Sequence, residues 1–417
     1  MDPPTLSIVL LAVVVIIAVA QLLGVLAERL GQPSVMGDIV GGIVLGPSLL
    51  GTLSPQGYAW LFQPEVRAQI NVLAQLGLVL FMFLVGLELN PGLIRKQLGL
   101  ASRLSLVGVL LPLLLGIGLA ALLEVWQPSL IQGDRTPQGV LFMGVAMAIT
   151  AFPVLARILT ERQLLAQPLG NLAISAASID DVVGWSLLAV VAAYSRTGSF
   201  AGGLPVLLQT ALYAAVLLLA TAPLRRWLSG RLGEGRPPRE LLQTFLLLGA
   251  LLSGLITERI GVHLIFGAFL WGLAMPRDAA MRQWLEMRLE TVVLRLLLPL
   301  FFAISGLNTQ IGSLHTPALW LATALVVATA VAGKFLGVWA VARASGVAPR
   351  EAQALGWLMN TRGLTELVVL NVGLSLGVIT PVLFSIGVLV ALTTTVAAGP
   401  LLSRLGYHRQ LGLRAGL

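Results

Sequence analysis

Thirteen apolar segments follow one another along this chain, and each is long enough to cross a lipid bilayer as a helix. They cover about residues 6–27, 35–50, 70–89, 98–123, 138–160, 168–194, 204–222, 240–257, 260–275, 290–307, 317–343, 351–374 and 378–403. The chain is 57% hydrophobic and only 11% charged over 417 residues, which is typical of a multi-pass membrane protein. We therefore expect an all-α membrane fold with about 13 spanning helices.

The connections between the segments are short. The longest polar ones, 56–69 and 229–239, are too short to fold alone, so we expect one transmembrane unit over residues 1–417 without a soluble domain. The chain begins MDPPTLS, and because no basic residue precedes its first apolar segment, we expect that segment to be a retained helix. With no cysteine, disulfides and thiolate metal sites are excluded.

The chain carries a net charge of +8, and its basic residues are unevenly distributed among the connections. Most lysines and arginines lie in alternate connections, a bias that the positive-inside rule explains without a nucleic-acid partner. The bias predicts an amino terminus outside and a carboxyl terminus in the cytoplasm. The cations that depart from it are Arg67, Arg135, Arg196 and Arg259 on the other side, and Arg295, Lys334 and Arg362 inside predicted spans.

Two adjacent carboxylates, Asp180 and Asp181, lie inside the apolar run from Pro168 to Tyr194. An aspartate at the centre of a membrane helix costs about 2.5 to 3.5 kcal/mol on translocon scales, so an intramembrane acid indicates a functional site. Neighbours on a helix point to different sides, and Ser178 lies on the side of Asp181. Carboxylate and hydroxyl oxygens favour a hard monovalent cation or a proton, and the alternative is a pair satisfied by hydrogen bonds between helices.

Two other spans are interrupted by residues that do not suit a membrane helix. In the segment 138–160, Pro153 removes a backbone donor, so Thr150 and the freed carbonyls are candidate ligands, unless Pro153 only kinks the helix. In the segment 351–374, a polar cluster interrupts the helix; its residues are Asn360, Thr361, Arg362, Gly363 and Glu366. Arg362 and Glu366 are four residues apart and could simply pair.

Lys334 is a lysine inside a predicted span, and it needs an acidic partner. Asp180 is the natural candidate.

The positions of the interrupted spans suggest an internal repeat. One interrupted span in each half of the chain indicates an inverted-repeat transporter whose site lies where the two discontinuous helices cross. The fourth to sixth spans would then match the eleventh to thirteenth. The thirteenth span has Thr393, Thr394 and Thr395 where the sixth has its aspartates, so we expect the acidic chemistry to be confined to one half.

Four motifs resemble the monovalent cation/proton antiporters of the second type, which include cyanobacterial sodium/proton antiporters, plant cation/proton exchangers and Kef-type potassium efflux systems. They are GDIVGGIVLGPSLLG (37–51), FLVGLELNP (83–91), ITAFPVLARILTE (149–161) and NTRGLTELVVLNVG (360–373). The last two look closest to the cyanobacterial and plant branch. In the first motif, its glycines predict close approach of a neighbouring helix.

The resemblance implies the sodium/proton antiporter fold, a homodimer and elevator-type alternating access without a cofactor. A core of residues 98–194 plus 317–403 would move against a dimerisation scaffold of residues 6–89 plus 204–307. Carried over by residue, Asp181 would be the main carrier of cation and proton, and Asp180 its partner, bonded to Lys334 in one state. Thr150 and Ser178 would add ligands for Na⁺, whereas Asn360, Arg362 and Glu366 would support the crossed helices.

The resemblance leaves several properties open. The plant branch often has Asn where this chain has Asp180, which leaves the proton stoichiometry open. The regulatory domain of Kef systems has no counterpart in this sequence. A K⁺/H⁺ exchanger or Kef-like efflux pathway remains an alternative to Na⁺/H⁺ exchange, and either the cytoplasmic or the thylakoid membrane fits.

Three further alternatives follow from the acids themselves. An intramembrane aspartyl protease needs two facing acids, usually from separate helices, whereas Asp180 and Asp181 are neighbours on one helix. A cation channel is separated from an antiporter only by transport kinetics. A transporter of organic anions is disfavoured by the adjacent acids.

Overall fold

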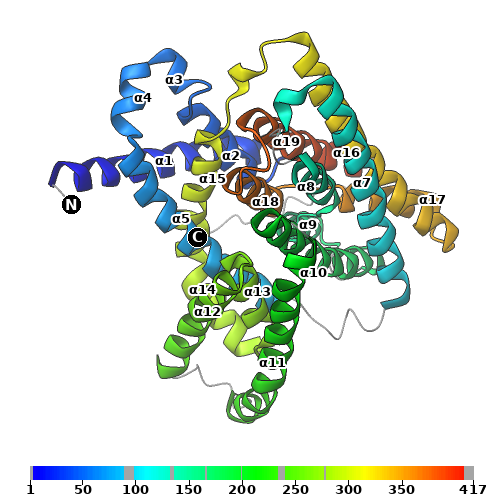
Figure 1. Ribbon diagram of the computed structural model, residues 1–417. Helices are drawn as coiled ribbons and strands as arrows, with labels where there is room; N and C mark the ends of the chain where they lie inside the picture. The colour runs from blue at the N-terminus through cyan, green and yellow to red at the C-terminus, as the bar shows by residue number, and fades with distance from the viewer. Residues whose placement is uncertain are drawn as a thin grey trace. The chain divides into compact units, whose positions relative to one another are not determined.

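The computed structural model describes residues 3–88, 98–131, 136–164, 167–198, 200–232, 240–276 and 279–407 (Figure 1). Its described part is helical, and the β-structure found there is one isolated antiparallel bridge between Ile131 and Ile379. The prediction of an all-α membrane fold is confirmed. Ten helices in these ranges are long and apolar enough to cross a membrane, and three shorter apolar helices accompany them. Together they correspond to the thirteen predicted segments.

The chain divides into two compact units. The first comprises residues 1–25, 37–90 and 192–308, and the second residues 26–36, 91–191 and 309–417. Most of the first unit is formed by α1 (Pro3–Arg29), α2 (Ser34–Leu45), α3 (Leu50–Leu53), α4 (Pro55–Leu61), α5 (Pro64–Glu88), α11 (Phe200–Leu232), α12 (Glu240–Ile260), α13 (Leu264–Ala274), α14 (Ala279–Val292), a π-helical turn (Val293–Leu297) and α15 (Leu298–Leu307).

Glycines bring helices of the first unit close together. α5 packs against α13 and α15, and α2 lies against α15 at Gly42. A methyl group added at Gly42 would lie 2.6 Å from the Phe302 carbonyl oxygen, so α15 can approach only because the side chain is absent. The approach predicted for this glycine motif is therefore observed.

Some helices differ in length from the apolar segments. α2 ends at Leu45 because Pro47 cannot donate to a continuing helix, and α3 and α4 follow where the hydropathy predicts a connection. α14 also lies in a predicted connection. Hydropathy measures how apolar a segment is, so it does not detect short or polar helices that pack on other helices.

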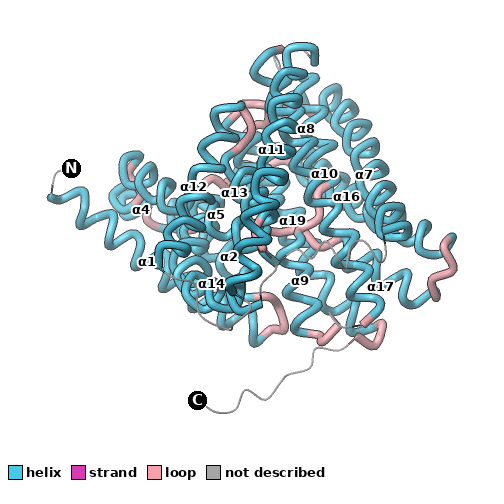
Figure 2. Tube along the Cα trace, turned by 90° about the horizontal axis from the view of Figure 1, so that it is seen from below, coloured by secondary structure: helices cyan, strands magenta, loops and turns pink. Residues whose placement is uncertain are grey.

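The second unit contains two copies of the same succession of helices. The first copy is α7 (Leu98–Trp126), α8 (Thr136–Ala148), α9 (Phe152–Glu161) and α10 (Pro168–Thr197), and the second is α16 (Pro317–Ala344), α17 (Pro349–Met359), α18 (Leu364–Ser375) and α19 (Pro381–Arg404). In each copy a long helix precedes two short ones and another long one follows. α7 and α16 lie side by side in both views (Figures 1 and 2).

Local sequence sets the ends of the helices in the second copy. Pro317 and Pro381 stand in the first turn of α16 and α19, where a missing backbone donor is harmless. The hydroxyls of Thr316 and Thr380 cap the same turns by accepting from the backbone N–H groups three residues later, at 3.2 and 3.3 Å.

Candidate functional site

Two of the predicted spans are broken helices that meet at their breaks. α8 ends at Ala148 and α9 begins at Phe152, with Pro153 in the first turn of α9. α17 ends at Met359 and α18 begins at Leu364. Between each pair of helices the chain leaves helical geometry for three or four residues, as the sequence predicts for Pro153 and the polar cluster.

The two breaks are joined directly to one another. The Ala151 backbone N–H donates to the Thr361 carbonyl at 3.0 Å, and the Thr150 hydroxyl donates to the Met359 carbonyl at 3.2 Å. The Thr365 hydroxyl lies 3.4 Å from the Thr150 carbonyl oxygen. The breaks therefore supply partners for backbone groups that each would leave unpaired within the bilayer.

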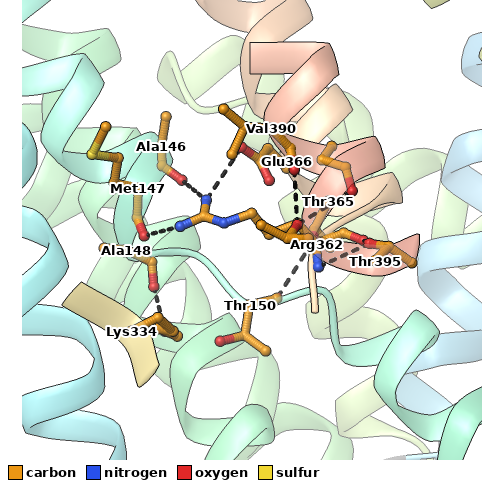
Figure 3. A network of polar contacts seen from close by, with 12 residues as sticks. Ala146, Met147, Ala148, Thr150, Lys334, Arg362, Thr365, Glu366, Val390 and Thr395 are labelled. Carbon is orange, nitrogen blue, oxygen red and sulfur yellow. Dashed lines mark hydrogen bonds and ion pairs between the residues drawn. The ribbon is translucent and has the colours of Figure 1, made fainter. Parts of the chain in front are cut away.

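Two buried cations satisfy the end of α8. An α-helix leaves its last carbonyls without partners and carries partial negative charge there. Arg362 donates to the carbonyls of Ala146 and Met147, at 2.9 and 2.6 Å, and Lys334 donates to that of Ala148 at 2.6 Å (Figure 3). Both cations thus have a structural role at the first break.

Asp180 is held by two partners on its Oδ2 atom. The Lys334 ammonium lies 2.7 Å from this oxygen, and the Thr150 hydroxyl donates to it at 2.7 Å. Asp180 is fully buried and Lys334 is 1% exposed, so the pair is shielded from water. Because neither charge would be tolerated alone at this depth, each depends on the other.

Asp181 differs from its neighbour. Its side chain is 1% exposed, and within the described residues neither carboxylate oxygen has a hydrogen-bond partner. Ser178, predicted beside it, is also buried, and its hydroxyl donates to the Ile174 carbonyl of its own helix at 2.7 Å. The oxygen of that hydroxyl keeps its acceptor capacity.

Glu366 forms an ion pair with Arg362. Its Oε1 is 3.2 Å from Arg362 Nη1, so the predicted pairing four residues apart is present. Its Oε2 has no hydrogen-bond partner among the described residues. Glu366 also lines a cavity of about 20 Å³, enough for one water molecule, with apolar residues of α8, α18 and α19.

Sequence reasoning missed the part that Thr395 plays. Its hydroxyl accepts from the Arg362 backbone N–H at 3.3 Å and donates to the Arg362 carbonyl. Thr395 on α19 thus binds a residue of the second break, as Asp180 on α10 binds Thr150 of the first. The repeat was the available signal, because it aligns the three threonines with the aspartates. The carbonyls of α8 have no such signal, since every residue carries one.

The site therefore combines a paired carboxylate, Asp180, with a second one, Asp181, that has no hydrogen-bond partner among the described residues. The oxygens of Thr150, Ser178, Asp180 and Asp181 suit a hard monovalent cation, and no sulfur or imidazole ligand is among them. In the described part of the chain, no group of three His, Cys, Asp or Glu residues could hold a metal ion. Chemically, a buried carboxylate beside an ion pair is a group that could hold either a proton or a cation.

The chain is similar to known sodium/hydrogen exchangers. Residues 11–406 match the family model described as sodium/hydrogen exchanger, transmembrane. The chain is 44% identical over 407 residues to the Na(+)/H(+) antiporter NhaS4 of Synechocystis sp., covering 97% of this chain and 98% of that protein.

Other relatives are more distant or longer. The chain is 40% identical over 413 residues to cation/H(+) antiporter 20 of Arabidopsis thaliana, covering 95% of this chain and 49% of the relative. It is 33% identical over 402 residues to K(+)/H(+) antiporter 1 of Saccharomyces cerevisiae, covering 95% and 46%. It therefore spans about half the length of these two relatives.

A solved structure shares the fold. The sodium proton antiporter MjNhaP1 from Methanocaldococcus jannaschii, at pH 8, superposes with a TM-score of 0.71 over 97% of this chain and 98% of that chain. The sequence identity is 15%, so this likeness concerns the fold alone.

Proposed function

This chain belongs to the sodium/hydrogen exchanger family, and on that premise we propose that it exchanges Na⁺ for protons across a membrane, with Asp181 as the carrier. The resemblance seen in the sequence motifs is thereby confirmed, and the chain is a multi-pass membrane transporter and not an enzyme. The observation that carries the proposal is the Asp181 carboxylate, which is buried and has no hydrogen-bond partner within the described residues.

Exchange follows from competition for one carboxylate. Asp181 holds either a proton or a cation, with Ser178, Thr150 and Asp180 as further oxygen ligands. An empty and charged Asp181 would be costly to carry through a low-dielectric barrier, so only the occupied site crosses. At Asp181 itself, one cation is therefore exchanged for one proton.

The Asp180–Lys334 pair sets the charge balance. When Asp180 turns toward a bound cation, Lys334 loses its partner and releases a proton, which makes a second transported proton. Asn360, Arg362 and Glu366 support the crossed helices around the site. The ion pair at 2.7 Å and the contacts of Arg362 with α8 support these roles.

At a larger scale the proposal includes movement of one part of the chain against the other. Residues 98–194 and 317–403 form a core that moves by an elevator mechanism against a scaffold of residues 6–89 and 204–307. Two copies pair through this scaffold as a homodimer. The amino terminus faces outside and the carboxyl terminus faces the cytoplasm, in a cytoplasmic or thylakoid membrane.

The test is proton movement induced by cations in proteoliposomes that contain a pH-sensitive dye. Addition of Na⁺ should collapse the pH gradient in wild type and leave it intact in Asp181→Asn, which keeps the side-chain size but removes the ionisable carboxyl. The same assay ranks Na⁺, Li⁺ and K⁺. A preference for K⁺ would favour the potassium/proton exchange named for the yeast relative. A wild type in which no cation moves protons would refute antiport.

A further inference from the structure

Asn360 occupies a central place at the crossing of the two broken helices. It is the residue directly after α17, between Met359 and Thr361. Both neighbours are bound to the other break, since the Met359 carbonyl accepts from the Thr150 hydroxyl and the Thr361 carbonyl accepts from the Ala151 N–H. The backbone at Asn360 is thus fixed alongside residues 150 and 151.

The side chain of Asn360 is buried without a partner. It is 1% exposed, and neither its amide nitrogen nor its amide oxygen has a hydrogen-bond partner in the part of the chain that the structure describes. An asparagine amide offers two donors and an acceptor, and buried polar groups in folded proteins are nearly always satisfied. Asn360 can support the crossing through its position in the backbone, and this leaves its side-chain amide available for a further role.

Asp181 is a second buried side chain without a hydrogen-bond partner among the described residues, and its chain neighbour is linked to that of Asn360. The Thr150 hydroxyl lies 2.7 Å from Asp180 Oδ2 and 3.2 Å from the Met359 carbonyl oxygen, and so it links these two residues. The residues that follow these two partners are Asp181 and Asn360, and both are buried with all their side-chain polar atoms unpaired among the described residues. Two such groups, whose chain neighbours are joined by the Thr150 hydroxyl, call for an explanation such as a bound ion or water.

We propose that Asn360 is a ligand of the transported cation, an inference that rests on the proposed antiport. Its amide oxygen is a neutral ligand of the kind that hard cations accept, so it adds coordination without changing the charge of the loaded site. When Asp181 carries a proton instead, the same amide oxygen accepts a hydrogen bond from the carboxylic acid. Asn360 therefore serves both loaded states of the carrier and contributes to the choice between cations.

The experiment compares Asn360→Leu with Asn371→Leu in proteoliposomes. Asn371 lies on α18, and its amide donates to the Leu367 carbonyl of the same helix at 2.8 Å, so its replacement removes an amide outside the site. In Asn360→Leu we expect the apparent KM for Na⁺ to rise about tenfold at a nearly unchanged maximal rate, which is the signature of lost binding. The ranking of Na⁺, Li⁺ and K⁺ should change as well. Asn371→Leu should keep the wild-type KM and ranking.

A binding measurement that needs no transport accompanies the assay. Na⁺ should raise the melting temperature of purified wild type and Asn371→Leu, because a ligand that binds only the folded state stabilises it. It should raise that of Asn360→Leu much less.

If Asn360→Leu does not fold, Asn360→Asp decides, because it keeps the size and a ligand oxygen but adds an ionisable group. It should then change the cation ranking and the pH dependence of the KM. A folded Asn360→Leu, or failing that an Asn360→Asp, with wild-type KM and cation ranking would overturn the inference. Antiport itself would still stand if Asp181→Asn abolished exchange in the same assay, so the two failures are distinguishable.

Discussion

At the scale of single residues, the two neighbouring aspartates have acquired different surroundings. Asp180 is paired with Lys334 and Thr150, whereas Asp181 has no hydrogen-bond partner within the described residues. The difference arises because adjacent residues on a helix face different neighbours. In the proposed antiport, one carboxylate thus stabilises the site while the other binds and releases the ion.

Removal of the Lys334 charge tests this division. Lys334→Met keeps a long side chain but leaves Asp180 and the Ala148 carbonyl without a cationic partner. We expect a loss of about 3 to 5 kcal/mol in the free energy of unfolding, since removal of one partner leaves a buried charge. Adding Asp180→Asn should recover much of this loss. Thermal unfolding in detergent measures both effects, and a double variant no more stable than Lys334→Met would contradict the pairing.

A further Lys334 variant tests the origin of electrogenicity. If Lys334 supplies a second proton, transport by Lys334→Ala should lose its dependence on membrane voltage while Asp181 still exchanges one ion for another. Proteoliposomes with an imposed potassium diffusion potential provide the measurement. Unchanged voltage dependence would reject the role of Lys334 in charge movement.

At the scale of helices, the breaks are held by contacts that come from other elements. Thr395 of α19 binds both backbone groups of Arg362, and Arg362 in turn binds the end of α8. Among the described residues, the neighbouring Thr394 donates only to the Val390 and Ala391 carbonyls of its own helix, although it is equally buried. Two adjacent threonines therefore have unequal structural importance.

A pair of isosteric variants measures that inequality. Thr395→Val leaves the backbone N–H and carbonyl of Arg362 unsatisfied and should destabilise the protein by about 1 to 3 kcal/mol. Thr394→Val should change stability by less than about 0.5 kcal/mol, because the carbonyls of its helix keep their backbone donors. The melting temperatures of the two purified variants give the comparison. Equal losses would show that Thr395 does not hold the second break.

The glycines of α2 allow a similar test in the first unit. A methyl group at Gly42 would lie 2.6 Å from the Phe302 carbonyl oxygen, but at Gly41 its nearest neighbours, in α1, are 3.5 Å away. Gly42→Ala should therefore force α2 and α15 apart and cost about 1 to 3 kcal/mol, as overpacking does. Gly41→Ala should be neutral or stabilise by up to about 1 kcal/mol. Thermal unfolding of the two variants checks the difference, and a stable Gly42→Ala would argue against the close packing.

At the scale of the whole molecule, the thirteen helical segments and the charge bias together predict the orientation. On this prediction, alternate connections face opposite sides of the membrane, and the basic ones face the cytoplasm. Ala348 lies in the connection from α16 to α17, and His315 in the connection from α15 to α16; both are exposed. The chain has no cysteine, so single cysteines report on these connections without a background.

Labelling of intact cells with a membrane-impermeant maleimide tests this topology. His315→Cys should react from outside, whereas Ala348→Cys should react only after the membrane is opened or in everted vesicles. Both variants should retain exchange, because neither residue belongs to the site. The reverse pattern would invert the proposed orientation, and reaction of both from outside would contradict the number of spans between them.

The amino-acid sequence by itself determined which segments form the apolar helices, the places where two of them break and the family. Each of these properties is written locally, in the length of an apolar run, in a proline such as Pro153, or in a motif of about fifteen residues. It also marked the charged residues of the site, because a charge inside an apolar run stands out on hydropathy alone.

Only the tertiary structure decided what those residues touch. The contacts of Thr150 with Met359, of Arg362 with α8 and of Thr395 with Arg362 join segments far apart in the chain. Half of these partners are backbone atoms, which every residue possesses and no sequence pattern marks. That Asn360 and Asp181 are buried without partners among the described residues also follows from packing, since burial and pairing exist only once the two broken helices cross.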